Sequence, residues 1–389
     1  MTELQAAADY FVREARSLSA MLIAAGDGTK QEQAGLGADE DAIFDLASLT
    51  KAFTALLVYR LMEEGALDPS SPVTRYAPMF RALGRVPVAE VLGFTTGLET
   101  PGRVDGAADR AEALDRLFAA QPVPIGDRPY SDIHAMTLKY VIEGAAGESY
   151  MDALRKRLLD PLGMTETFDR VPDALLKRCL DYDREHRIER GRYILREGLL
   201  PGMPHDPKAL KLWPGDGCPG HAGLFSTLTD MVRFCRGALG LKIVGRESLR
   251  DMAKRRTGFV RPDGSCQQYL GAQCYIRHPI QTFSEVPGYM SDQAVAWSGF
   301  TGNHMSLDPA RGIFVLALGN RVRNRLTVLL PGPGETIMDY GLRPDGTGEI
   351  TWPDGERVIS SVRYVYLRDE HLHAHVARAL GLADPAADT

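Results

Sequence analysis

The sequence predicts an α+β fold, in which an α/β domain with a central antiparallel sheet flanked by helices carries a mainly helical insert. Apolar runs typical of buried strands lie near both ends of the chain, at 20–25 and after 223. Between them the pattern is one of short helices and loops. We therefore assign 1–72 and 223–389 to the sheet domain and 73–222 to the insert, and we expect a cleft between the layers.

The N-terminal region predicts a helix, a buried strand and a second, longer helix. In residues 4–18 apolar side chains recur at three- and four-residue steps, the period of an amphipathic helix. Residues 20–25 form a short apolar run that ends at the turn 26–28, so we expect the first buried strand there. The next helix runs from about Ser48 to Glu64, and Gly65 follows it where a helix end favours a left-handed residue.

Farther along the chain, helices alternate with loops before strand patterns return. Residues 170–222 are rich in proline, glycine and charge and predict irregular structure. Two apolar runs, Met305–Leu307 and Ile313–Leu318, flank the turn 308–312 and predict a hairpin. Residues 331–356 predict a surface excursion. The remaining helices are expected near 107–119, 134–146, 149–160 and 368–380.

The composition is that of an ordinary globular protein and excludes several classes of function. Of the 389 residues, 44% are hydrophobic and 25% are charged, which excludes disorder as the main state. Lys plus Arg number 45 and Asp plus Glu number 51, so the net charge is −6, and it is spread along the chain. A nucleic acid is therefore not an expected partner. Neither is a membrane, because no apolar run approaches the ~18 residues that span a bilayer.

The cysteines and the N-terminus predict a cytoplasmic protein. The chain has five cysteines with no Cys-x-x-Cys spacing, a pattern that argues against a disulfide framework and against a zinc site. The segment Met1–Leu4 lacks the basic and apolar regions of a signal peptide. We expect reduced thiols and a protein that needs no metal or organic cofactor.

The segment Ser48-Leu49-Thr50-Lys51 is the first candidate for catalytic chemistry. Residues three apart on a helix share a face, so the hydroxyl of Ser48 and the amine of Lys51 can come within hydrogen-bond distance. A serine hydroxyl needs a proton acceptor to become a good nucleophile, and a lysine that is shielded from water loses proton affinity and can be that acceptor. The alternative is that Ser48 only caps the helix and that Lys51 lies at the surface.

Three further segments are candidate motifs that accompany this tetrad. Tyr130-Ser131-Asp132 precedes a predicted helix, Gly220–Thr227 lies in the middle of the chain, and Trp297–Gly302 ends a predicted strand. Together they resemble the serine β-lactamase and penicillin-binding-protein superfamily, and within it the class C β-lactamase-related esterases and peptidases. The resemblance runs in the family's order from about 45 to 320 and implies a β-lactamase-like fold.

The resemblance implies a role for each residue at a matching position. Ser48 would be the acylated nucleophile, Lys51 would take its proton or lower its pKa, and Tyr130 would carry the proton to the leaving group. The backbone N–H groups of Ser48 and Phe300 would form the oxyanion hole. Gly299, just before Phe300, would allow a close approach of the substrate.

Two departures from the family pattern bear on the substrate. Trp297-Ser298-Gly299 stands where the superfamily has Lys-Thr-Gly or His-x-Gly, so the resemblance places these three residues at the substrate. The cation that often binds a carboxylate of the substrate is missing from this position. The tryptophan would offer an apolar stacking wall instead. Asp132 replaces the usual Asn, and it either repels anionic substrates and prefers an amine, or holds Lys51. Both departures favour esters or neutral amides.

Two histidine segments are weaker candidates. His205-Asp206 is similar to a His-Asp turn of the same branch and either lines the cleft or shapes a loop. His221 is expected to order the segment near the third strand.

The sequence thus predicts a serine hydrolase that acts through an acyl-Ser48 intermediate, most simply a carboxylesterase or amidase on a small neutral ester or amide. The alternatives are an acyltransferase that uses the same acyl-enzyme, a β-lactamase or D,D-peptidase, and a non-catalytic binding protein on the same fold. The expected partner is the small-molecule substrate, and the sequence gives no oligomeric state.

Overall fold

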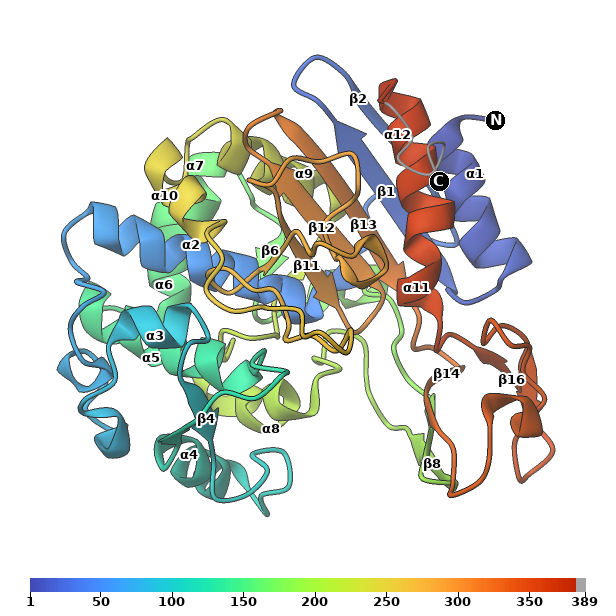
Figure 1. Cartoon of the computed structure of the whole chain (residues 1–389), viewed down its shortest axis with the longest axis horizontal. Coiled ribbons are helices and arrows are strands. Elements are labelled where there is room, and N and C mark those ends of the chain that lie inside the picture. The colour runs from blue at the N-terminus through green and yellow to red at the C-terminus, as the bar shows by residue number, and fades with distance from the viewer. Residues whose placement is uncertain (383–389) are drawn as a thin grey trace.

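A six-stranded antiparallel sheet forms the centre of the molecule (Figure 1). The computed structural model describes residues 1–382, apart from the side chains of Pro214 and Asp216. The sheet has the order β10-β11-β12-β13-β1-β2 and joins the two ends of the chain, as predicted. Its strands are β1 (Ala20–Gly26), β2 (Gln31–Leu36), β10 (Tyr275–Ile276), β11 (Val295–Gly299), β12 (Asn303–Asp308) and β13 (Ile313–Asn320).

Helices cover both faces of this sheet. On one face α1 (Glu3–Asp9) and α12 (Ala374–Leu380) pack together, and on the other lie α2 (Thr50–Glu63) and α9 (Leu228–Leu239) (Figure 1). Successive side chains of a strand point to opposite faces, so each face of β1 contributes to its own core. A strand buried on both faces has a continuous apolar run rather than an alternating one, which is why β1 was recognisable in the sequence.

The remaining helices gather mainly beyond α2, on the left of Figure 1. The predicted helices at 4–18, 149–160 and 368–380 each contain a π-helical turn, at Tyr10–Glu14, Arg155–Leu159 and Asp369–His373. The other helices are α3 (Val88–Leu92), α4 (Arg110–Phe118), α5 (Asp132–Ala146), α6 (Tyr150–Leu154), α7 (Asp160–Leu162), α8 (Pro207–Asp216), α10 (Arg246–Met252) and α11 (Tyr364–Arg368).

A second sheet, at the lower right of Figure 1, has no counterpart in the sequence expectations. Two of its strands come from the segment 170–222, which was expected to be irregular, and two from 331–360 around a core that includes Trp352 and Val358. Its order is β15-β16-β14-β7-β8. The strands are β7 (Glu185–Glu189), β8 (Arg192–Arg196), β14 (Arg325–Leu330), β15 (Glu349–Thr351) and β16 (Arg357–Ser360).

Strand pairing therefore crosses the predicted boundary at 222. β7 lies within the predicted insert and pairs in parallel with β14. The small sheet β3-β9-β6 also joins the two parts, through β3 (Phe44–Asp45), β6 (Thr167–Phe168) and β9 (Phe225–Ser226), while β4 (Gly97–Glu99) pairs only with β5 (Gln121–Val123). The division of the chain at 72 and 222 stays a prediction.

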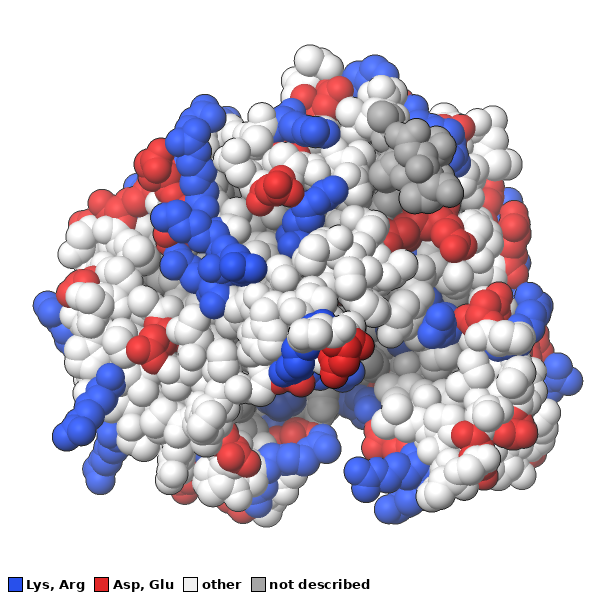
Figure 2. Space-filling view, in the orientation of Figure 1, with Lys and Arg blue, Asp and Glu red and all other residues white. Residues whose placement is uncertain are grey.

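The surface drawn in Figure 2 is hollowed between α8 and the second sheet, and groups of both charges border the hollow. Within residues 1–382, the helices are too short or too polar to cross a membrane.

Candidate active site

Ser48 follows a strained residue between β3 and α2. Ala47 has a φ of 46°, in the left-handed region that side chains disfavour, and the carboxylate of Asp45 accepts its N–H at 2.8 Å. Ser48 itself lies in the 3₁₀ turn Ala47–Leu49, which leads directly into α2. The predicted helix therefore begins with a tighter turn, and Ser48 is not its capping residue.

Lys51 is fully buried and points at the hydroxyl of Ser48. Its Nζ lies 2.9 Å from Ser48 Oγ, 2.8 Å from Asp132 Oδ1 and 3.2 Å from the carbonyl oxygen of His221. An ammonium group has three N–H bonds, so these three acceptors use all of them. The alternative of a surface lysine is wrong.

The charge of Lys51 differs from the sequence expectation. Burial alone would lower the pKa of Lys51, but the charges of Asp132 and Tyr130 overcome that effect and hold it above its ordinary value. The expectation of a lysine with a lowered pKa is therefore wrong for the resting site. The physical reason is the ion pair between Lys51 and Asp132, which was one of the two roles that the sequence left open for Asp132.

Asp132 is the first residue of α5, and it contacts two lysines at once. Its Oδ1 pairs with Lys51 at 2.8 Å and its Oδ2 with Lys208 at 3.0 Å. Burial alone would raise the pKa of Asp132, but Lys51, His221 and Lys208 hold it well below its usual range. Of the two roles left open for Asp132, the structure shows that it holds Lys51, and both of its oxygens already have a partner.

Tyr130 lies between two other aromatic rings. Its ring stacks on Tyr275 at a centroid distance of 5.2 Å and on Phe94 at 5.6 Å. Lys51 Nζ lies 4.9 Å from the centre of the Tyr130 ring. The two neighbours fix the plane of the phenol beside the Ser48–Lys51 pair, a placement that suits a group that moves protons.

The turn after β11 lies against the nucleophile segment. A Cβ atom on Gly299 would lie 2.9 Å from the carbonyl oxygen of Leu46, so a side chain there would push the two segments apart. Thr301 and Asn303 donate side-chain hydrogen bonds to the carbonyl oxygen of Asp45, at 3.0 and 2.8 Å. These contacts fix the turn that carries Phe300 beside the segment that carries Ser48.

The two backbone N–H groups assigned to the oxyanion hole have a common property. Among the described residues, neither the N–H of Ser48 nor that of Phe300 donates to a protein acceptor. Two such donors, on segments that are held together, can bind the oxygen of a tetrahedral intermediate. Their role stays a prediction.

Trp297 and Ser298 point to opposite faces of β11. Trp297 is only 1% exposed, packs in the main core and donates its Nε1–H to the carbonyl oxygen of Gln273 at 2.8 Å. It offers a ligand almost no surface, so the expectation of an aromatic wall is wrong. Ser298 instead donates to Glu285 at 2.5 Å and accepts from Arg368 at 2.8 Å. Contact of either side chain with substrate stays a prediction.

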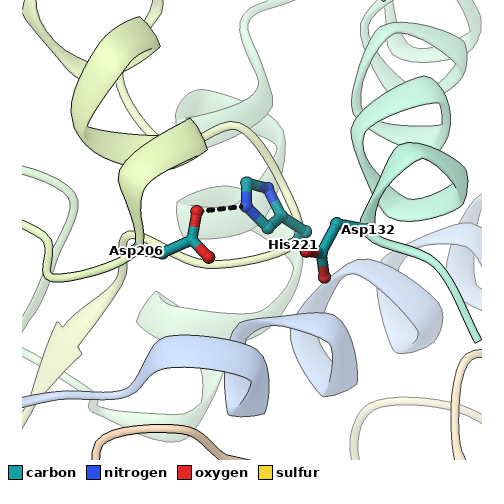
Figure 3. A group of neighbouring side chains, drawn as sticks. All are labelled: Asp132, Asp206 and His221. Carbon is teal, nitrogen blue, oxygen red and sulfur yellow. Dashed lines mark hydrogen bonds and ion pairs between the residues drawn. The ribbon is translucent and has the colours of Figure 1, made fainter. Parts of the chain in front are cut away.

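Asp206, His221 and Lys208 lie next to the ion pair of Lys51 and Asp132, and Lys208 was not among the candidates from the sequence. Asp206 caps α8 by accepting the N–H groups of Lys208 and Ala209, both at 2.9 Å, and its Oδ1 also binds Nε2 of His221 at 2.8 Å. Burial alone would raise the pKa of Asp206, but His221 lowers it to about 2. The side chains of Asp132, Asp206 and His221 converge (Figure 3).

This trio has the residue types of a cation site, with its ligand atoms within 4.8 Å of one another. However, the lysines already neutralise Asp132, and Asp206 already binds His221 and two N–H groups. The arrangement is therefore a network of internal ion pairs around Lys51. The sequence reasoning selected His205 and Asp206 but not Lys208, because nothing in the chain indicated that the amine of Lys208 reaches Asp132.

His205 connects the second sheet to the site. Its N–H donates to Asp45 Oδ2 at 2.7 Å, and its Nε2 lies 3.1 Å from the buried carboxylate of Glu185 in β7. Its ring stacks on Phe300, with centroids 5.6 Å apart and planes 8° apart. His205 thus positions the turn after β11 rather than only shaping a loop.

Replacing Asp132 by Asn is expected to make the stability of the fold less sensitive to acid. Because the folded pKa of Asp132 is lowered, its contribution is full above the ordinary pKa of 3.8 and is lost as the pH falls towards the folded pKa. Urea unfolding at about pH 7 and about pH 3 measures the loss over that interval. The loss should be smaller in Asp132→Asn than in the wild type, and unchanged in the control Asp115→Asn, whose carboxylate is exposed.

Comparisons with known proteins agree with this geometry. The Beta-lactamase family model matches residues 4–328. Esterase EstB of Burkholderia gladioli is 29% identical over 364 residues, covering 82% of this chain and 89% of the relative. A putative D-alanyl-D-alanine carboxypeptidase of Salmonella typhimurium is 25% identical over 345 residues, covering 82% of this chain and 78% of the relative.

Solved structures share the fold. EstCE1, a hydrolase with promiscuous acyltransferase activity, superposes with a TM-score of 0.63 at 18% identity, covering 82% of this chain and 92% of the other. A class C β-lactamase gives a TM-score of 0.60 at 17% identity, covering 82% and 91%. The family model spans the central sheet, the Ser48 segment and the turn after β11. The chain therefore belongs to the Beta-lactamase family and is a serine hydrolase.

Proposed function

We propose that this protein is a carboxylesterase or amidase that acts through an acyl-Ser48 intermediate on a small neutral ester or amide. The observation that carries the proposal is the 2.9 Å contact between Ser48 Oγ and Lys51 Nζ, in a group that also contains Tyr130. A serine with an amine at this distance can be deprotonated as it attacks a carbonyl carbon. The N–H groups of Ser48 and Phe300 would stabilise the resulting oxyanion.

The reaction needs a neutral amine at Lys51 to accept the proton of Ser48, whereas in the resting site Lys51 is held in its charged ammonium form. The active form is the one in which Lys51 has lost its proton. Lys51 then receives the proton of Ser48, and Tyr130 passes a proton to the leaving group. Water, activated by the same pair, releases the acyl group from Ser48.

The preference for a neutral substrate rests on the third motif. Trp297 replaces the cation that would meet a substrate carboxylate, and its side chain is buried. The similarity to an esterase supports the ester class. An acyltransferase is a second candidate, because EstCE1 has such an activity and the same acyl-enzyme can react with an alcohol or amine.

Labelling with a fluorophosphonate probe tests the proposal. Wild-type protein is expected to gain one adduct by intact-mass spectrometry, and Ser48→Ala none, because only an activated serine reacts. A panel of p-nitrophenyl esters, neutral amino-acid amides and one penicillin then identifies the substrate class. Equal labelling of both proteins would overturn the assignment of Ser48, and a stable penicillin adduct with little ester turnover would favour a penicillin-recognising enzyme.

A further inference from the structure

Lys208 shares the carboxylate of Asp132 with Lys51. It lies in the first turn of α8, where Asp206 caps the helix, and its Nζ is 3.0 Å from Asp132 Oδ2. The other oxygen of the same carboxylate is 2.8 Å from Lys51 Nζ. The side chain of Lys208 is 27% exposed and that of Lys51 is fully buried. Two ammonium groups therefore face one anion, and only the inner one contacts Ser48.

Asp132 and Lys208 have opposite effects on the protonation of Lys51. The negative charge of Asp132 favours the ammonium form of Lys51, which cannot accept a proton. The positive charge of Lys208, on the far oxygen of the same carboxylate, disfavours that form. Burial alone would lower the pKa of Lys208, but Asp132 and Asp206 hold it above its ordinary value, so Lys208 keeps its charge through the neutral range.

We propose that Lys208 is a positioning residue for catalysis, which weakens the hold of Asp132 on the proton of Lys51 and so lets Lys51 act as the acceptor for Ser48. The inference rests on the proposed function. In the step concerned, the O–H bond of Ser48 breaks as its Oγ forms a bond to the acyl carbon. The proton goes to the free electron pair of Lys51 Nζ, and the leaving group later departs with a proton delivered through Tyr130.

The described polar groups in contact with Lys51, and the charged groups next to them, come from four segments, and Tyr275 of β10 packs behind Tyr130. Ser48 comes from the turn before α2, Tyr130 and Asp132 from the start of α5, and the carbonyl oxygen of His221 from the loop after α8. The start of α8 adds Asp206, which binds the imidazole of His221, and Lys208, which also senses the charge of Asp105. Lys208 and Lys51 both bind Asp132, but of the two only Lys51 contacts Ser48.

The test is the pH profile of Lys208→Met. Because the pKa of Lys51 is held above its ordinary value, the rate of fluorophosphonate labelling at Ser48 and kcat/KM for a p-nitrophenyl ester, corrected for uncatalysed hydrolysis, are measured from about pH 7 to about pH 12. In each profile the rate rises with pH as Lys51 loses its proton, and this rising part is the acid limb. Without the charge of Lys208, the acid limb of both profiles is expected to move up by about one pH unit, while the plateau at high pH is kept. A residue with only a structural role would lower the rate at every pH and leave the limb in place.

Three variants make the result specific. Lys208→Arg keeps the charge and is expected to restore the limb to its wild-type position. Lys211→Met removes a lysine from the same helix that is not a partner of Asp132, and its limb is expected to stay unmoved. Asp132→Asn removes the anion itself, so its limb is expected to move down, opposite to that of Lys208→Met.

The outcomes separate this inference from the proposed function. If Ser48 is labelled but the limb of Lys208→Met stays in place or moves down, the role of Lys208 is overturned while the serine hydrolase assignment stands. If the wild-type protein is not labelled at Ser48 at any pH, the proposed function itself fails. An upward shift in Lys208→Met, reversed by Lys208→Arg and absent in Lys211→Met, supports the inference.

Discussion

Replacing Lys51 by Met is expected to lower kcat/KM for an activated ester by about 10²- to 10⁴-fold, the range that a positioned general base contributes. The hydroxyl of Ser48 then loses its one amine neighbour, at 2.9 Å. The fold should persist, because Met matches the length of the fully buried Lys51 and Asp132 keeps Lys208 as a partner at 3.0 Å. Steady-state kinetics and urea unfolding on the same preparation separate the two effects.

Lys139→Met is the matched control for this experiment. Lys139 is also buried, at 3% exposure, and pairs with Glu143 at 3.1 Å on α5. Its removal is expected to reduce stability without a comparable loss of kcat/KM, since it does not contact Ser48. Activity of Lys51→Met within about tenfold of the wild type would show that another group takes the proton of Ser48.

Gly299→Ala is expected to reduce kcat by about 10²- to 10³-fold, the effect of losing one donor of an oxyanion hole. The added Cβ would lie 2.9 Å from the carbonyl oxygen of Leu46 and 3.1 Å from Cβ of Asn303. Because Leu46 O is a backbone atom, the turn with Phe300 must move away from the segment with Ser48. The loss should appear in kcat more than in KM, since the oxyanion forms only after binding.

The control for this substitution is Gly126→Ala. Its Cβ would meet no atom within 4 Å, so activity and stability should both stay near wild type. The two variants are compared by steady-state kinetics and by thermal unfolding. If Gly299→Ala keeps its full kcat while folded, the N–H of Phe300 does not serve the oxyanion.

The central sheet and the nucleophile helix were predictable because their signals are local. The apolar run at 20–25 became β1, and the runs around 308–312 became the hairpin of β12 and β13. The second sheet was not predictable, because β7 pairs with β14, far away in the sequence. Charged side chains also interrupt the apolar pattern of β7 and β8, where Glu185 and Arg196 pair across the two strands at 2.7 Å.

The site divided in the same way between local and distant contacts. Ser48 and Lys51 are three residues apart, so a helix brings them together whatever the rest of the chain does. Whether the side chain of Trp297 points into the core or away from it depends on which face of β11 packs against the core. The alternation of side chains along a strand does not decide between these two orientations. Lys208 reaches Asp132 only through the packing of α8 beside α5, for which the sequence carries no local signal.

The hydrogen bonds of Asp45 have a consequence for the order of folding. Its carbonyl oxygen accepts from Thr301 and Asn303, 256 and 258 residues away, and its carboxylate accepts from His205, 160 residues away. Contacts of such long sequence separation form late, because closing large loops costs entropy before the contacts repay it. A chain emerging from the ribosome thus holds Ser48, Lys51 and Tyr130 long before β11 is made. Ser48 therefore stays without the N–H of Phe300, the predicted second donor to the oxyanion, until the chain has been made beyond β11.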